Sequence, residues 1–121
     1  MLDPKQIAER YIATWNETDA RKRSALLQDN WNGDASYVDP MAKVVGRDDI
    51  DGLIGGVQQR FPGFRFTLTG APNGYGEYVR FSWSLGPAGV EAPIEGSDVL
   101  QIDDGRIARV IGFLDKIPQA A

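Results

Sequence analysis

The sequence contains no histidine and no cysteine among its 121 residues. Disulfide bonds, a cysteine nucleophile, a Ser-His-Asp triad, a zinc site and a haem ligated by either residue are therefore excluded. Proton transfer in this protein must rely on carboxylates, tyrosines, lysines or bound water. The lack of cysteine also fits a reducing compartment, so we expect a cytoplasmic location.

Basic clusters and long apolar runs are lacking as well. The net charge is −4 and is spread along the chain, which leaves no stripe of Lys and Arg for a nucleic acid. No apolar run approaches the ~18 residues that span a membrane, and residues 1–4 do not have the pattern of a signal peptide. We therefore expect neither nucleic acid nor a membrane as a partner. The length predicts a single domain over residues 1–121 with a core of its own.

The N-terminal segment has the pattern of an amphipathic helix. Asp3-Pro4 is typical of a helix start, because Asp caps free N–H groups and Pro suits the first helical position. Ile7, Tyr11 and Trp15 then recur every four residues. This spacing predicts a helix that extends to about residue 16 and has Tyr11 on its apolar face.

Further helices and a short strand are predicted up to residue 61. Asp19 is placed to cap a short second helix. Asn32-Gly33-Asp34 predicts a turn, and residues 35–38 form a strand that Asp39-Pro40 ends. Apolar residues over 50–61 have helical spacing. The Gly55-Gly56 pair within that helix costs roughly 1 kcal/mol per glycine, which indicates a close packing contact or a bend.

The second half of the chain has the pattern of strands. Apolar residues alternate with polar ones, and segments rich in Gly, Pro, Asn and Asp separate the alternating runs. The predicted strands cover residues 64–69, 79–85, 92–102 and 107–114, and the predicted turns cover 71–76, 86–89 and 103–105. Helices followed by antiparallel strands predict an α+β fold.

Three residues place a proton-handling group where apolar neighbours are expected. Tyr11 lies on the apolar face of the first predicted helix, and Asp39 ends a strand beside Pro40. Asp98 falls within a predicted strand, on the same face as Leu100. An Asp on such a face must be hydrogen-bonded or protonated, and burial raises its pKa.

Each of these residues also has a purely structural interpretation. A Tyr on a helix face is most often part of the core, with its hydroxyl at the rim. Asp39 is placed to cap a turn, and one β-bulge would turn Asp98 outward to solvent. Taken singly, none of the three residues therefore decides between a structural role and a role in proton transfer.

Four segments spread along almost the whole chain form a recognisable set. They are Glu9-Arg10-Tyr11-Ile12-Ala13-Thr14-Trp15-Asn16, Tyr37-Val38-Asp39-Pro40, Ala92-Pro93-Ile94 leading to Asp98, and Gly105-Arg106-Ile107. Together they resemble the ketosteroid-isomerase branch of the nuclear-transport-factor-2-like superfamily, to which SnoaL-like proteins belong. The resemblance implies a cone-shaped, strongly curved mixed or antiparallel sheet on N-terminal helices around an apolar pocket. Such a cystatin-like α+β barrel is commonly a homodimer through its sheet.

The resemblance also implies roles for the three residues. In the isomerases, the Asp before Pro moves a proton next to a carbonyl, and the helix Tyr and a protonated strand Asp hold the oxyanion. By position, Asp39 would be the base, and Tyr11 and Asp98 the oxyanion donors. The activity would be a cofactor-independent isomerase or cyclase reaction that needs no metal. Glu95, three residues earlier, is the alternative to Asp98 if the register of that strand slips.

Other branches of the superfamily match these positions less well. Dehydratase relatives rely on pocket histidines, which this chain lacks. Limonene-epoxide-hydrolase-like relatives have an Arg two residues before the strand Asp and a second Asp in the last strand. Those positions are Gly96 and Gly112 in this sequence.

The expected partner is a small hydrophobic ligand held among aromatic and aliphatic side chains. The residues predicted to line its pocket are Trp15, Phe61, Phe66, Phe81, Trp83, Leu100 and Phe113. Arg80 is expected on the opposite face of the sheet, with contact to an acidic ligand as the alternative. The alternative function is a module that binds a hydrophobic ligand, or dimerises, without chemistry.

Overall fold

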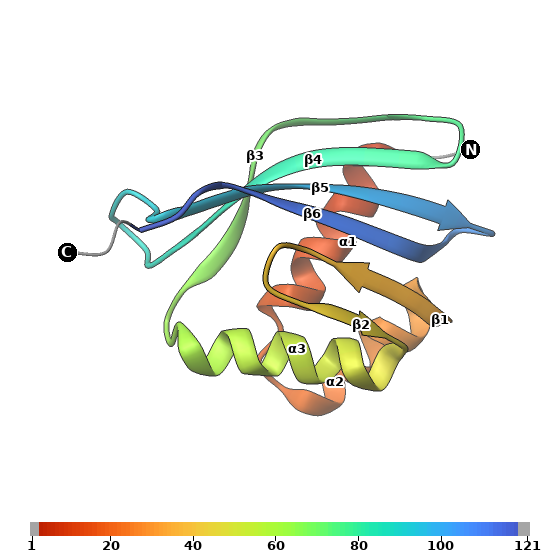
Figure 1. Ribbon diagram of the computed structural model, residues 1–121, viewed down its shortest axis with the longest axis horizontal. Coiled ribbons are helices and arrows are strands. Elements are labelled where there is room, and N and C mark those ends of the chain that lie inside the picture. The colour runs from red at the N-terminus through yellow and green to blue at the C-terminus, as the bar shows by residue number, and fades with distance from the viewer. Residues whose placement is uncertain (1–2, 119–121) are drawn as a thin grey trace.

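The computed structural model describes residues 3–118, which form three helices and one six-stranded sheet (Figure 1). The helices are α1 (Pro4–Asn16), α2 (Ala20–Asn30) and α3 (Arg47–Arg60). The strands are β1 (Trp31–Val38), β2 (Lys43–Val45), β3 (Arg65–Tyr75), β4 (Tyr78–Gly86), β5 (Ile94–Asp103) and β6 (Arg106–Lys116). The ends of the predicted domain, residues 1–2 and 119–121, lie outside the described residues. No helix within residues 3–118 is both long enough and apolar enough to cross a membrane.

The sheet is mixed and curved. Its strand order is β2-β1-β6-β5-β4-β3, and β1 and β6 pair in parallel while the other neighbours pair antiparallel. In Figure 1, α1 passes behind the sheet, and α3 runs along the side where β1 and β2 lie. The predicted α+β fold with a curved mixed sheet on N-terminal helices is confirmed. The sheet stays open, with β2 and β3 as its edges.

The core forms where the apolar face of α1 packs on the inner face of the sheet. Asp3 caps α1 as predicted, accepting the backbone N–H of Gln6. Tyr11 and Trp15 are both buried, as helical spacing requires for residues four apart. Along β5 every second residue is buried, and Asp98 lies in that buried row. The helix and strand periods together point Tyr11 and Asp98 at the same interior.

Two predicted turns are in fact parts of strands. Residues 71–76 were expected as a turn, but β3 continues to Tyr75, so of these residues only Gly76 lies in the turn to β4. The register of the pairing between β3 and β4 shifts between Thr69 and Asn73. The shift absorbs the turn-forming residues, and an edge strand such as β3 tolerates a Pro. Residues 32–34 were likewise expected as a turn but belong to β1, which shifts register between Trp31 and Ser36. In Figure 1, β3 bends on its way from the end of α3 to the side of β4.

The two glycines in the middle of α3 have different surroundings. A Cβ on Gly55 would lie 3.4 Å from the Nη2 nitrogen of Arg23, so the predicted close contact is correct at this position. A Cβ on Gly56 would meet no atom within 4 Å. Packing within the chain therefore does not explain Gly56.

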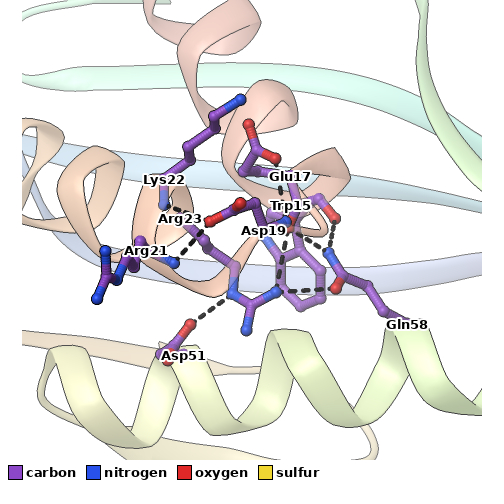
Figure 2. A network of polar contacts seen from close by, with 8 residues as sticks. All are labelled: Trp15, Glu17, Asp19, Arg21, Lys22, Arg23, Asp51 and Gln58. Carbon is purple, nitrogen blue, oxygen red and sulfur yellow. Dashed lines mark hydrogen bonds and ion pairs between the residues drawn. The ribbon is translucent and has the colours of Figure 1, made fainter.

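A buried arginine joins the three helices (Figure 2). Arg23 of α2 donates from Nε to Asp51 Oδ1 of α3 at 2.5 Å, and from Nη1 to Gln58 Oε1 at 2.9 Å and to the carbonyl of Glu17 at 3.1 Å. Gln58 Nε2 in turn donates to the carbonyls of Trp15 and Glu17, at 2.9 Å each. This network fixes α3 relative to the C-terminal end of α1. Both helices contribute residues to the wall of the cavity described below.

We predict that Asp51→Ala lowers the free energy of unfolding by about 2–4 kcal/mol, because it leaves the charge of Arg23 buried without a counter-ion. The matched control is Glu91→Ala, which breaks the exposed ion pair with Lys116 and should cost less than about 1 kcal/mol. Urea denaturation of both variants measures the difference. Equal losses for the two variants would contradict a fixing role for the network.

Candidate active site

The centre of the site is a buried pair of proton-holding groups. The hydroxyl of Tyr11 donates to Asp98 Oδ2 at 2.6 Å. Only 2% of Tyr11 and 3% of Asp98 are exposed to solvent. The hydrogen bond joins α1 to β5 across 87 positions of the sequence.

The structure decides between Asp98 and Glu95. Glu95 lies an odd number of residues from Asp98, so strand alternation places it on the outer face of the sheet. Its carboxylate lies 3.9 Å from the Nζ of Lys116 there. The alternative in which Glu95 faces the pocket is therefore wrong. Arg80 is also exposed, on the opposite side of β4 from the buried Phe81.

A second pair lies at the end of β1. Asp39 Oδ1 accepts the backbone N–H groups of Met41 and Ala42, at 2.8 Å each, and Oδ2 accepts the hydroxyl of Tyr37 at 2.6 Å. The predicted turn cap is thus correct, but a side-chain donor was missed. Tyr37 precedes Asp39 by two residues in an extended segment, and this spacing puts both side chains on one face. The sequence therefore contained the signal that identifies Tyr37.

The two pairs meet at a glycine of β6. A Cβ on Gly112 would lie 2.9 Å from Asp98 Oδ1, 3.2 Å from Asp39 Cβ and 3.6 Å from the hydroxyl oxygen of Tyr37. Any larger residue at this position would displace these side chains. The lack of a side chain at Gly112 therefore lets the two carboxyl groups approach each other.

Steric contacts also explain the glycine at position 96. A Cβ on Gly96 would overlap the ring of Trp83. An Arg at this position, as in limonene-epoxide-hydrolase-like relatives, is thus incompatible with the packing of Trp83. The acid–base set of those relatives is absent here for a physical reason.

A cavity of about 620 Å³ opens beside the two pairs. Tyr11, Tyr37, Asp39 and Asp98 all line it. Its remaining wall is mostly apolar and includes Trp15, Leu53, Val57, Phe61, Phe66, Trp83, Leu85, Ile94, Leu114 and Ile117. The structure thus brings the three predicted site residues together around one cavity, with four of the predicted pocket residues in its wall.

Three residues predicted to line the pocket lie elsewhere. Phe81 is buried behind Tyr11, whose ring centroid lies 5.2 Å from its own. Leu100 is completely buried in the core. Phe113 is 54% exposed, because alternation along β6 sends it to the outer face next to the inward Gly112. The homodimer predicted through this face stays a prediction.

Burial sets the protonation states in the site. It raises the pKa of Asp98 from 3.8 to about 6, and the charge of Asp39 adds to the rise while the hydrogen bond from Tyr11 opposes it. Burial also raises the pKa of Tyr11 and of Tyr37 far above 10, and in both cases Asp98 adds to the rise. Both tyrosines therefore remain hydrogen-bond donors at neutral pH. Asp98 becomes a donor when it takes up a proton at a pH near 6.

The sequence profile of the SnoaL-like domain matches residues 8–110. The chain belongs to the SnoaL-like family. This chain is similar to the solved structure of a protein of the SnoaL-like family from Agrobacterium tumefaciens strain C58, which is provisionally named an isomerase. The two chains are 40% identical with a TM-score of 0.87, and the match covers 91% of this chain and 95% of the other.

More distant structures share the fold alone. A provisionally named ketosteroid isomerase from Kribbella flavida is 21% identical with a TM-score of 0.70, over 98% of this chain and 82% of the other. A provisionally named polyketide cyclase from Sinorhizobium meliloti is 17% identical with a TM-score of 0.70, over 88% of this chain and 93% of the other. No curated protein matches the sequence.

We predict that Asp98→Asn changes how stability depends on pH. Because the pKa of Asp98 is about 6 in the folded protein and 3.8 as a free group, the folded state holds more protons between these values. The wild type should therefore lose stability relative to the Asn variant as the pH rises from 4.5 to 7.5, by about 2 kcal/mol.

Urea denaturation at pH 4.5 and 7.5 measures this difference. Asp103→Asn, at the exposed end of the same strand, is the matched control and should leave the pH dependence unchanged. The assignment fails if the stability gap between wild type and Asp98→Asn is the same at both pH values.

Proposed function

We propose that this protein is a cofactor-independent enzyme that moves a proton next to the carbonyl group of a small hydrophobic compound, in an isomerisation or a cyclisation. The observation that carries the proposal is the meeting of two tyrosine–carboxyl pairs at one mostly apolar cavity. One pair offers hydrogen-bond donors for an oxygen. The other offers a carboxylate within the same cavity wall.

The substrate oxygen would bind beside Tyr11 and protonated Asp98. Tyr11 would turn its hydroxyl from Asp98 to the substrate, and the proton on Asp98 would supply a second hydrogen bond. Negative charge that develops on this oxygen is stabilised most strongly where water is excluded and donors are already in place. A negatively charged oxygen also favours the neutral form of Asp98, because a like charge nearby raises the pKa of a carboxyl group.

Asp39 would accept the proton from the carbon next to the carbonyl. A carboxylate has about four acceptor positions, and Asp39 uses three of them for Tyr37, Met41 and Ala42. One acceptor position therefore remains for the substrate proton. The three donors hold the carboxylate in a single orientation, which favours transfer along one path. Asp39 then returns the proton to a second carbon in an isomerisation.

The relatives support this reaction class to different degrees. The Agrobacterium protein, 40% identical, is provisionally named an isomerase. The provisional polyketide cyclase shares only the fold at 17% identity. Both names agree with proton transfer next to a carbonyl, and the first gives isomerisation more weight.

A second candidate function is the binding of a hydrophobic ligand without chemistry. The observation that favours it is that each carboxyl group already has a partner within the chain. Asp39 in particular caps the turn after β1, a role that needs no substrate. The same cavity would then hold a ligand beside two closed hydrogen-bonded pairs.

Hydrogen–deuterium exchange separates the two functions without knowledge of the substrate. Small cyclic ketones and enones, such as 2-tetralone and cyclohexenone, are incubated with the protein in D₂O and followed by NMR. We predict that the wild type accelerates exchange at the carbon next to the carbonyl, and that Asp39→Asn reduces the acceleration at least roughly 100-fold, since general bases contribute about 10²–10⁴.

Asp34→Asn, an exposed substitution outside the cavity, is the control and should exchange like the wild type. Equal exchange by Asp39→Asn and the wild type would rule out Asp39 as the base. Ketones that bind without any accelerated exchange would favour the binding function.

A further inference from the structure

One row of residues on α3 forms a side of the cavity. Gly52, Gly56 and Arg60 are four residues apart, which places them on one face of the helix. All three line the cavity, together with Leu53 and Val57 from the same face. Along the row of Gly52, Gly56 and Arg60, the cavity wall is therefore bare backbone at the two glycines and a guanidinium group at Arg60.

The two glycines leave space that the protein itself does not fill. A Cβ on Gly52 or on Gly56 would meet no atom within 4 Å. The neighbouring Gly55 differs, because a Cβ there would contact Arg23. Glycine inside a helix costs roughly 1 kcal/mol relative to alanine, and at these two positions no packing contact offsets this cost. The unfilled space beside them belongs to the cavity.

Arg60 is an isolated cation at the mouth of the same cavity. It is exposed, and its guanidinium carbon lies 5.9 Å from the ring centroid of Phe61. Within residues 3–118 the ion pairs involve Arg23 and Lys116, and none involves Arg60. The remaining charged groups of the cavity wall are the carboxyls of Asp39 and Asp98.

The polar groups of the cavity are therefore arranged by depth. Asp98 is 3% exposed, whereas Arg60 is exposed at the C-terminal end of α3. In Figure 1 this end of α3 lies on the same side of the molecule as the end of β6. Ile117, which follows β6, also lines the cavity there. If the oxygen of a ligand binds at Asp98, the opposite end of that ligand would thus lie near Arg60.

We propose that the substrate is a flat, apolar carbonyl compound that carries a carboxylate at the end remote from the reacting oxygen. Its flat body packs on the backbone strip of Gly52 and Gly56, and its carboxylate binds Arg60. The planar guanidinium group pairs with a carboxylate through two parallel hydrogen bonds. This inference rests on the proposed function, because it takes the oxygen site at Tyr11 and Asp98 as given.

Two naphthols test the inference by isothermal titration calorimetry at low ionic strength. Both 2-naphthol and 6-hydroxy-2-naphthoate have a flat body and a phenol oxygen, but only the second carries a carboxylate at the far end. We expect the wild type to bind the naphthoate roughly two- to fivefold more tightly, as an exposed ion pair at low ionic strength provides. Arg60→Gln should remove this preference and leave 2-naphthol binding unchanged. Arg65→Gln, an exposed control outside the cavity, should keep it.

Gly56→Ala tests the flat strip. It should weaken the binding of both naphthols at least roughly fivefold, while the melting temperature stays equal or rises because alanine favours the helix. Gln59→Ala, exposed on α3 outside the cavity wall, is the control and should leave binding unchanged.

The outcomes separate this inference from the proposed function. Equal binding of both naphthols by the wild type, or a preference that survives in Arg60→Gln, overturns the role of Arg60 and leaves the oxygen site intact. Unchanged binding by Gly56→Ala overturns the flat strip. Failure of the wild type to bind either naphthol counts against the oxygen site, and the inference then falls with the proposed function.

Discussion

A carboxyl group enclosed by aromatic side chains needs either a proton or hydrogen-bond donors, and this requirement organises the interior of the protein. Asp98 receives a hydrogen bond from Tyr11 at 2.6 Å, and burial raises its pKa to about 6. The bond joins the first helix to the middle of the sheet. It also leaves a carboxylic acid and a phenol side by side in the wall of the cavity, where both can donate to one oxygen.

The rest of the structure keeps these groups accessible and aligned. Gly112 leaves room for Asp98 and Asp39 to approach the same point of β6. The network around Arg23 holds α3 against the end of α1, and both helices contribute residues to the cavity wall. Gly52 and Gly56 leave a strip of bare backbone on the α3 wall, beside Leu53 and Val57. The glycines leave space where a side chain would otherwise lie: at Gly112 for Asp98 and Asp39, and at Gly52 and Gly56 for a ligand.

Much of the fold and part of the site could be predicted from the sequence. Helical spacing put Tyr11 inward and strand alternation put Asp98 inward, because each period depends only on local geometry. Tyr37 was missed although its two-residue distance from Asp39 in a strand signals a shared face. The same alternation sends Phe113 outward. The sequence could not predict that Tyr11 separates Phe81 from the cavity, because this depends on how α1 crosses the sheet. Register shifts also hid two strand segments, since a bulge and a turn use the same residues.

The proposed function depends on one interaction, the binding of a ligand oxygen by Tyr11 and Asp98 together. A crystal structure of the protein with a bound phenol tests it most directly. We expect the phenol oxygen within hydrogen-bond distance of both the Tyr11 hydroxyl and the Asp98 carboxyl, with the ring among the apolar residues of the cavity. A phenol bound elsewhere in the cavity, with the bond between Tyr11 and Asp98 intact, would contradict it.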